Sequence, residues 1–233
     1  VHAGKDVPTT RAAIEAGLAD LPFPGVARKL VIRPGRPDKV LCAEARSQNA
    51  QLLVAGALEK EGVLADLVGS TARRLARHAP CSVLLLPHPK MTGTAFERIL
   101  AHVAYDEASR EMLSYCACFC HAYGVKQLRV VSEFTSIRTD VGLAGDSSFS
   151  AETSAREWRN AELSNLMGFL ETVPLQPISV VADCLEAREG GGVVGYAQRQ
   201  GSDLLTIPAP RTPFAFLERF FSNSAEIVLQ RLP

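Results

Sequence analysis

The chain has 233 residues, with 25 Lys and Arg residues against 25 Asp and Glu residues, and 47% of its residues are hydrophobic. This length allows one large domain or two small ones, and the composition is that of a packed globular protein. The zero net charge argues against nucleic acid as a partner, because proteins that track phosphates carry a basic excess. We see no secretory leader in the sequence, and its apolar runs are much shorter than the roughly 20 residues that span a bilayer. We therefore expect a cytoplasmic protein with no membrane span in this chain.

Short aliphatic runs alternate along the chain with longer stretches of helical periodicity. The expected strands are 29–32, 52–55, 82–86, 99–104, 128–133, 178–182 and 204–207, and the expected helices are 8–20, 38–48, 70–77, 107–123, 151–171, 193–200 and 213–231. Strands that alternate with helices of this length indicate right-handed crossovers between parallel strands. The sequence therefore predicts an α/β fold of the Rossmann-like type, with open parallel sheets covered by helices on both faces.

The second half of the chain repeats the first. Residues 51–57 (QLLVAGA) have a counterpart in 203–209 (DLLTIPA), and residues 69–80 have one in 222–233, at offsets of 152 and 153 residues. We interpret this as a tandem duplication, with a first repeat at 1–90 and a second at 95–233 joined by a link rich in Pro and Gly. The first repeat lacks an opening strand and helix and the second lacks its last strand, so we expect a fragment, or a chain whose ends are missing.

The six cysteines lie in apolar segments, and we expect them to be reduced thiols. Cys116, Cys118 and Cys120, with His121, form a C-x-C-x-C-H cluster that could indicate a metal. Helical periodicity over 109–123 turns Cys118 away from the other two thiols, so that the three cannot converge on one ion. A buried apolar helix face is therefore favoured over a metal or redox role.

The segment 53–86 contains three glycines, Gly56, Gly62 and Gly69. The last of them precedes Ser70 and Thr71, two hydroxyl residues at the start of an expected helix. This segment resembles the closing third of the universal stress protein family, whose members have a five-stranded parallel α/β fold. The ATP-binding branch of that family holds phosphates in a G-x2-G-x9-G-[S/T] loop. The candidate nucleotide-binding residues that the resemblance implies here are Gly56, Gly62, Gly69, Ser70 and Thr71.

The chemistry of such a loop has a physical reason of its own. Glycines let the backbone approach an anion closely, and a hydroxyl at a helix start adds to the free N–H groups there. Gly56 fills the first position of the loop and Gly69 with Ser70 fills the last pair, whereas Glu59 replaces the second glycine. A carboxylate at Glu59 would repel a triphosphate unless it points outward. The alternative for the Gly69 to Thr71 stretch is a helix N-cap without a ligand.

The second repeat also resembles the family over 98–133, where Asp106 matches the acidic residue that contacts the nucleoside. The alternative for Asp106 is a strand-end carboxylate that caps the helix expected at residue 107. The stretch 208–223, which corresponds to the phosphate loop, holds three prolines and no glycine. Because proline lacks an N–H donor, we expect that the second repeat does not bind ATP in the manner of the family.

No catalytic constellation is present: the five histidines are scattered, and no Ser or Cys stands in a nucleophile-elbow pattern. The resemblance therefore implies a noncatalytic stress-response or regulatory module, whose repeats pair as an internal pseudo-dimer and whose first repeat senses an adenine nucleotide, ATP or AMP.

The alternative is a cytosolic regulatory tail of a membrane transporter or antiporter, and an enzyme such as an ATP hydrolase ranks third. We also expect a homo-oligomer or a protein partner, because one helix stripe cannot bury all of Phe214, Phe216, Phe220 and Phe221.

Overall fold

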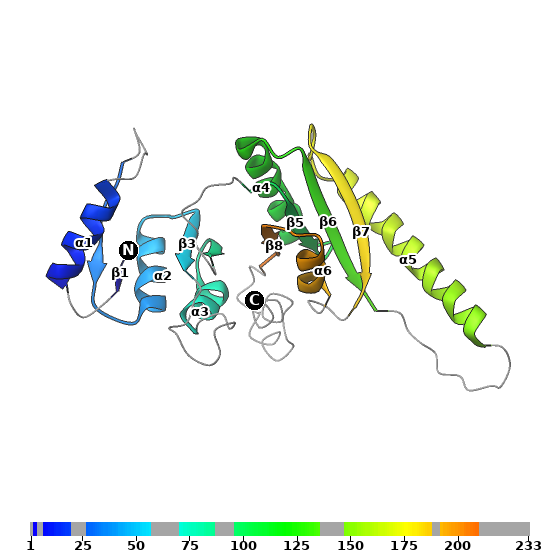
Figure 1. Ribbon diagram of the computed structural model, residues 1–233, viewed down its shortest axis with the longest axis horizontal. Coiled ribbons are helices and arrows are strands. Elements are labelled where there is room, and N and C mark those ends of the chain that lie inside the picture. The colour runs from blue at the N-terminus through cyan, green and yellow to red at the C-terminus, as the bar shows by residue number, and fades with distance from the viewer. Residues whose placement is uncertain are drawn as a thin grey trace. The chain divides into compact units, whose positions relative to one another are not determined.

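The computed structural model describes residues 2–3, 7–19, 27–56, 70–86, 96–135, 147–187 and 192–209. The chain separates into two compact units, Val1–Lys90 and Met91–Leu232 (Figure 1). Each unit has its own hydrophobic core, with one cluster of buried residues in the first unit and two clusters in the second.

The first unit alternates strands and helices in the order β1 (His2–Ala3), α1 (Val7–Ala19), β2 (Ile32–Arg33), α2 (Pro37–Ser47), β3 (Leu52–Gly56), α3 (Ser70–His78) and β4 (Ser82–Leu86). Its described strands form two separate parallel pairs, β1 with β2 and β3 with β4. Helices α2 and α3 cover one face of the second pair, where Leu75 of α3 is fully buried and Leu53 of β3 is 8% exposed. On the other face of β3, Leu52 and Val54 are about half exposed.

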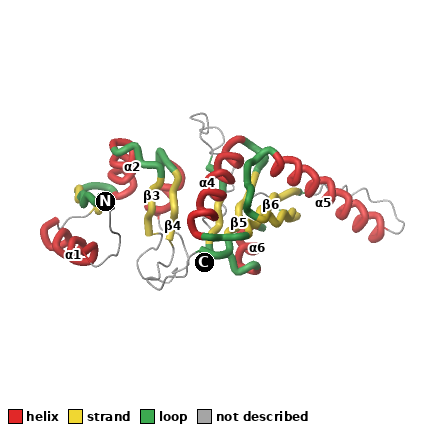
Figure 2. The backbone as a smooth tube through the Cα atoms, turned by 90° about the horizontal axis from the view of Figure 1, so that it is seen from above, coloured by secondary structure: helices red, strands yellow, loops and turns green. Residues whose placement is uncertain are grey.

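The second unit forms one sheet of four parallel strands. Its elements are β5 (Ile99–Val103), α4 (Glu107–Tyr123), β6 (Gln127–Phe134), α5 (Ser147–Glu171), β7 (Ser179–Glu186), α6 (Val193–Arg199) and β8 (Leu204–Thr206). The strand order is β7-β6-β5-β8. Helices α4 and α5 pack on one face of this sheet and α6 packs on the other (Figure 2).

The central strand β5 is buried along its whole length. Its alternate residues Ile99, Ala101 and Val103 pack against α4 and α5, whereas Leu100 packs against α6. Burial of both sets of side chains is what a parallel strand covered on both faces requires. This explains why residues 99–103 are almost continuously apolar in the sequence.

The parallel α/β architecture predicted from the sequence is confirmed, and α4 has the predicted bounds. Three elements differ most from the prediction. Strand β2 is Ile32–Arg33, whereas we expected a strand at 29–32. Helix α5 begins at Ser147, so residues 147–150, which we expected in a connection, are helical. Strand β7 continues to Glu186 and pairs with β6 over eight residues, although we expected it to end at residue 182. The helix expected at 213–231, with its four phenylalanines, lies outside the described residues.

The cysteines of α4 follow the helical periodicity. Cys116 and Cys120 are buried and Cys118 is exposed, and burial raises the pKa of the Cys116 thiol to about 11. Helical periodicity also places Tyr123 on the stripe of Cys116 and Cys120, but Tyr123 is half exposed, and its ring stacks on Phe119 at a centroid distance of 4.4 Å.

Within the described ranges, no group of three or more His, Cys, Asp or Glu side chains is placed to hold a metal ion. None of the helices that the structure describes is both long enough and apolar enough to cross a membrane.

Candidate functional site

The expected phosphate loop of the first unit leaves the sheet at Gly56. Gly56 is the last residue of β3 and lies opposite Leu86 of β4, and the carboxyl ends of parallel strands are where open α/β sheets bind ligands. Gly56 is exposed, and a Cβ atom added to it would meet no heavy atom within 4 Å. The backbone at the beginning of this loop is therefore open to the approach of a ligand.

The loop ends where α3 begins, at Ser70. Ser70 is exposed and Thr71 is half buried. The first turn of α3 contains no acidic residue, and its last turn contains Arg77 and His78. No negative side chain of α3 itself therefore offsets the positive end of the helix dipole at Ser70. The structure thus places Gly56, Ser70 and Thr71 at the two ends of the loop, whereas Gly62, Gly69 and Glu59 lie outside the described residues.

In the second unit the strand order reverses between β5 and β8. The chain runs outward from β5 to β6 and β7 and then returns to the other side of β5, and ligands bind at such a reversal in open sheets. Asp106 follows β5 and Pro208 follows β8. Pro208 is buried and has no N–H to offer a phosphate. The rest of the corresponding loop lies outside the described residues.

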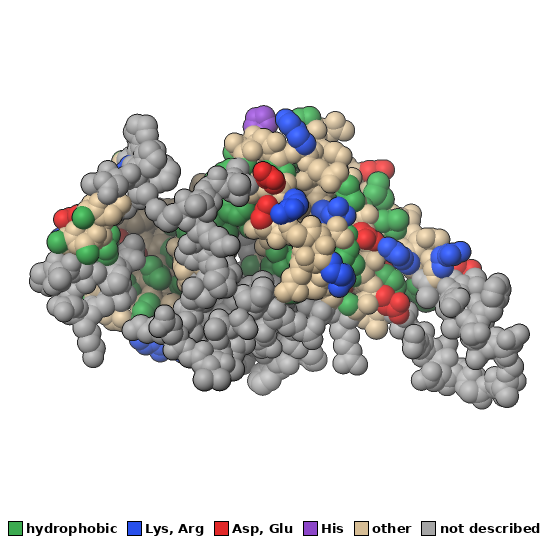
Figure 3. All heavy atoms as spheres, in the orientation of Figure 1, with side chains coloured by type: hydrophobic (Ala, Val, Ile, Leu, Met, Phe, Trp, Pro, Cys, Tyr) green, Lys and Arg blue, Asp and Glu red, His purple; other side chains and the backbone are tan. Residues whose placement is uncertain are grey.

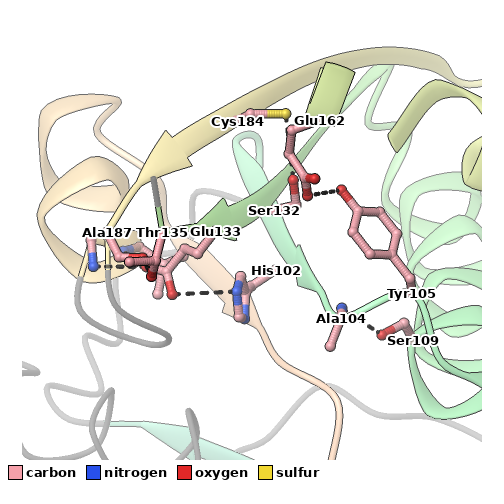
Figure 4. A network of polar contacts seen from close by, with 12 residues as sticks. His102, Ala104, Tyr105, Ser109, Ser132, Glu133, Thr135, Glu162, Cys184 and Ala187 are labelled. Carbon is pink, nitrogen blue, oxygen red and sulfur yellow. Dashed lines mark hydrogen bonds and ion pairs between the residues drawn. The ribbon is translucent and has the colours of Figure 1, made fainter. Parts of the chain in front are cut away.

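Asp106 caps helix α4. Its Oδ1 atom accepts hydrogen bonds from the backbone N of Ser109 at 2.8 Å and from the Ser109 hydroxyl at 2.6 Å. The Ser109 Oγ atom in turn accepts from the backbone N of Ala104 at 2.9 Å (Figure 4). These bonds tie the end of β5 to the start of α4. They show the capping role of Asp106, and its contact with a nucleoside stays a prediction.

Tyr105, between β5 and Asp106, has a strained backbone. Its φ angle is 58°, in the left-handed region that residues with side chains rarely adopt. Its hydroxyl is hydrogen bonded to the Glu162 carboxylate of α5 (Figure 4), and its ring meets Phe169 edge-on at 5.5 Å. Burial and the neighbouring Glu162 raise the pKa of Tyr105 far above its ordinary value, so the tyrosine stays neutral and donates to the carboxylate. The sequence analysis missed this residue, because a positive φ at tyrosine depends on tertiary contacts.

A buried pair, His102 of β5 and Glu133 of β6, lies on the α6 side of the sheet (Figure 4). The two side chains are 2% and 1% exposed, and 3.6 Å separates His102 Nε2 from Glu133 Oε2. The other oxygen, Oε1, accepts hydrogen bonds from the backbone N atoms of Gly192 at 2.7 Å and Val193 at 2.8 Å. Glu133 therefore joins β6 to the first turn of α6. Sequence reasoning missed this pair, since each residue alone reads as a polar interruption of an apolar strand.

Gly192 has no room for a side chain beside Glu133. A Cβ atom at Gly192 would lie 2.8 Å from Ala187 Cβ and 3.2 Å from Glu133 Oε1. We therefore expect Gly192→Ala to lower the free energy of unfolding by about 1–3 kcal/mol, as measured by urea denaturation. The matched control is Gly195→Ala in the same helix, where the added Cβ meets only the flexible end of Arg199 at 3.4 Å. A loss of stability in the control as large as in Gly192→Ala would contradict the steric explanation.

An open parallel sheet, with glycine and hydroxyl residues where a strand gives way to a helix, defines the class of α/β proteins that bind ligands at the carboxyl edge of the sheet. Within this class, residues 4–87 match the universal stress protein family. This part of the first unit is thus similar to that family, and the matched residues include Gly56, Ser70 and Thr71. The chain is 33% identical over 55 residues to the universal stress protein Slr1101 of Synechocystis sp.; this alignment covers 24% of the chain and 51% of that relative. The chain thus spans about half the length of the curated relative that it matches.

Solved structures show the same fold over nearly the whole chain. A universal stress protein from Archaeoglobus fulgidus DSM 4304 has a TM-score of 0.59 and 14% identity, with 97% of this chain and 71% of that chain covered. A protein of unknown function from Pseudomonas aeruginosa PAO1 has a TM-score of 0.65 and 17% identity, with 99% and 78% covered. At these identities the likeness shows the α/β fold.

Proposed function

We propose that this protein is a noncatalytic regulatory module of the tandem universal stress protein type, whose first unit binds an adenine nucleotide, ATP or AMP. The observation that carries this proposal is the open backbone at Gly56, at the carboxyl end of β3 and within the segment that matches the family. The phosphates would lie between Gly56 and the start of α3, where Ser70 and Thr71 bring hydroxyl groups to the positive end of the helix.

The strand order supports the repeat interpretation. In the second unit the opening strand, β5, lies between the second strand, β6, and the fourth, β8. If the first unit follows the same order, its opening strand would lie between β1 and β3. The two separate pairs that the structure describes, β1 with β2 and β3 with β4, are compatible with that order, in which β1 and β3 are not direct neighbours. The segments aligned by the repeat, 51–57 and 203–209, contain β3 and β8, which are then both fourth strands.

The two units would have different roles. In the second unit Asp106 serves α4 as a cap and Pro208 takes the position that corresponds to the loop glycines. Glu133 likewise serves as a cap, for α6. Asp106 and Glu133 thus have structural tasks, which favours binding and regulation over chemistry.

Replacing Gly56 with alanine tests the site without disturbing the fold. The added Cβ meets open space, so we expect the free energy of unfolding to change by less than about 0.5 kcal/mol. The methyl group would cover the backbone that a phosphate must approach, and we expect the dissociation constants for ATP and AMP, measured by calorimetry, to rise at least tenfold, by about 1.4 kcal/mol. The matched control is Gly17→Ala in α1, where an added Cβ also meets nothing within 4 Å; it should bind nucleotide like the unsubstituted protein.

Two results would contradict the proposal that the first unit binds an adenine nucleotide. One is the absence of binding heat with either nucleotide in the unsubstituted protein, together with no protection of the Gly69, Ser70 and Thr71 amides from hydrogen exchange. The other is unchanged nucleotide affinity in Gly56→Ala, which would place the ligand elsewhere.

A further inference from the structure

An open cavity of about 580 Å³ lies beside β7 in the second unit. Its walls come from α5 and α6, which cover opposite faces of the sheet, and its floor comes from the carboxyl end of β7. Strands β7 and β8 are at opposite ends of the strand order. The cavity is therefore separate from the carboxyl ends of β5 and β8, and neither the family match at residues 4–87 nor the candidate nucleotide loop includes it.

Three arginines line this cavity. Arg156 and Arg159, three residues apart on α5, lie on the same side of that helix, and Arg199 ends α6. Basic side chains are visible over α5 on the face of the molecule that Figure 3 shows. Asp183 and Glu186 also line the cavity, so the charged side chains around it are three positive and two negative.

Asp183 and Arg159 hold each other in place. Arg159 Nη2 lies 2.7 Å from Asp183 Oδ1, which also accepts from the backbone N of Cys184 at 2.8 Å, and the Tyr196 hydroxyl donates to Asp183 Oδ2 at 3.0 Å. Burial alone would raise the pKa of Asp183, but the hydrogen bonds from Arg159, Cys184 and Tyr196 and the Arg159 charge outweigh burial and lower it. Asp183 thus neutralises Arg159. The guanidinium groups of Arg156 and Arg199 outnumber the remaining carboxylate, that of Glu186, and leave a net positive charge for binding.

The remaining walls suit the organic part of a ligand. Phe134 and Leu185 give an aromatic and an aliphatic surface. Tyr196 also lines the cavity, and its hydroxyl is fixed by accepting from Arg129 at 3.2 Å while donating to Asp183. A volume of about 580 Å³ lies within the range that accommodates small organic ligands.

We propose that this cavity binds a small organic phosphate, through the guanidinium groups of Arg156 and Arg199, at a second ligand site beside β7. Guanidinium groups pair with the oxygens of phosphates and carboxylates in bidentate geometry. A phosphoryl group fits this arrangement better than a carboxylate does, because its three terminal oxygens serve two arginines that come from different helices. The apolar wall at Phe134 and Leu185 then covers the group that carries the phosphate.

The test uses the full chain with phenyl phosphate as the probe, titrated by calorimetry in parallel with inorganic phosphate and benzoate. We expect phenyl phosphate to bind more tightly than the other two. The double variant Arg156→Gln/Arg199→Gln should weaken phenyl phosphate binding at least tenfold. The matched control is Arg98→Gln, which removes one positive charge at the opposite, amino end of the sheet of the same unit and should change the affinity less than twofold. Circular dichroism shows whether each variant is folded.

Three outcomes overturn the proposal: no binding of phenyl phosphate, tighter binding of benzoate than of phenyl phosphate, or a loss in Arg98→Gln as large as in the double variant. An equal loss in Arg98→Gln would mean that phenyl phosphate responds to the overall positive charge of the protein and not to a defined site. The Gly56→Ala variant should bind phenyl phosphate normally, so a failure at this site is distinguishable from a failure of the nucleotide loop.

Discussion

Replacing Glu133 with alanine is expected to lower the free energy of unfolding of the second unit by about 3–5 kcal/mol. The variant leaves the N–H groups of Gly192 and Val193 without the carboxylate oxygen that they share, and it leaves His102 without its buried partner. Urea denaturation followed by the fluorescence of Trp158, the only tryptophan in the sequence and a residue of α5, reports on this unit.

The isosteric variant Glu133→Gln separates the two tasks of this carboxylate. Its amide oxygen can still accept from Gly192 and Val193, while the charge opposite His102 is lost. We expect Glu133→Gln to lose about half as much stability as Glu133→Ala. Equal losses in the two variants would contradict the role of Glu133 as the cap of α6 and assign the whole effect to its charge.

The second large effect is expected from Leu166→Ala in α5. Leu166 is fully buried and belongs to the cluster that joins α4 and α5 to the sheet, so its truncation should cost about 2–5 kcal/mol through lost burial and the cavity left behind. Met167, the next residue, is 49% exposed, and Met167→Ala should change the stability by less than about 0.5 kcal/mol. The same denaturation measurement checks both variants. Similar losses in the two would mean that α5 is not held on the sheet by the face that carries Leu166.

The parts of the fold that the sequence predicted best are those fixed by local chemistry. Helix α4 has a capping residue, Asp106, at its start, an apolar stripe along its length, and Gly124 at a φ of 69° just after its end. Every one of these signals lies within or beside the helix itself. Short aliphatic runs likewise predicted that β3 and β8 are strands, and residues 51–57 and 203–209 share one apolar pattern.

The misplaced end of β7 has a physical cause. A parallel strand covered on both faces reads as a continuous apolar run, and that run ends where Asp183 follows Ala182. Strand β7 is at the end of the strand order, with β6 on one side only. Polar side chains such as Asp183 and Glu186 are tolerated there, because one side of the strand faces the open cavity and not another strand.

The candidate sites were predictable only in part, because some of their contacts join residues that are far apart in the sequence. A glycine at a strand end and a hydroxyl at a helix start are adjacent in the sequence to the elements that position them, so Gly56, Ser70 and Thr71 could be assigned from the sequence. The cavity beside β7 depends instead on contacts such as Arg159 with Asp183 and Tyr196 with Arg129, which join separate elements. No local pattern marks such contacts.

The hydrogen bond from the Cys184 backbone N to Asp183 has a consequence for the behaviour of the protein at high concentration. Ser179 and Ala187 donate their N–H groups to β6, so the intervening even-numbered residues of β7, Cys184 among them, direct theirs away from the sheet. A strand from another molecule can pair with an exposed row of backbone N–H groups and extend the sheet. Edge strands start aggregation in this way. Asp183 occupies the Cys184 N–H and is itself anchored by Arg159. An incoming strand would have to break both interactions, so this pair keeps the sheet from growing between molecules.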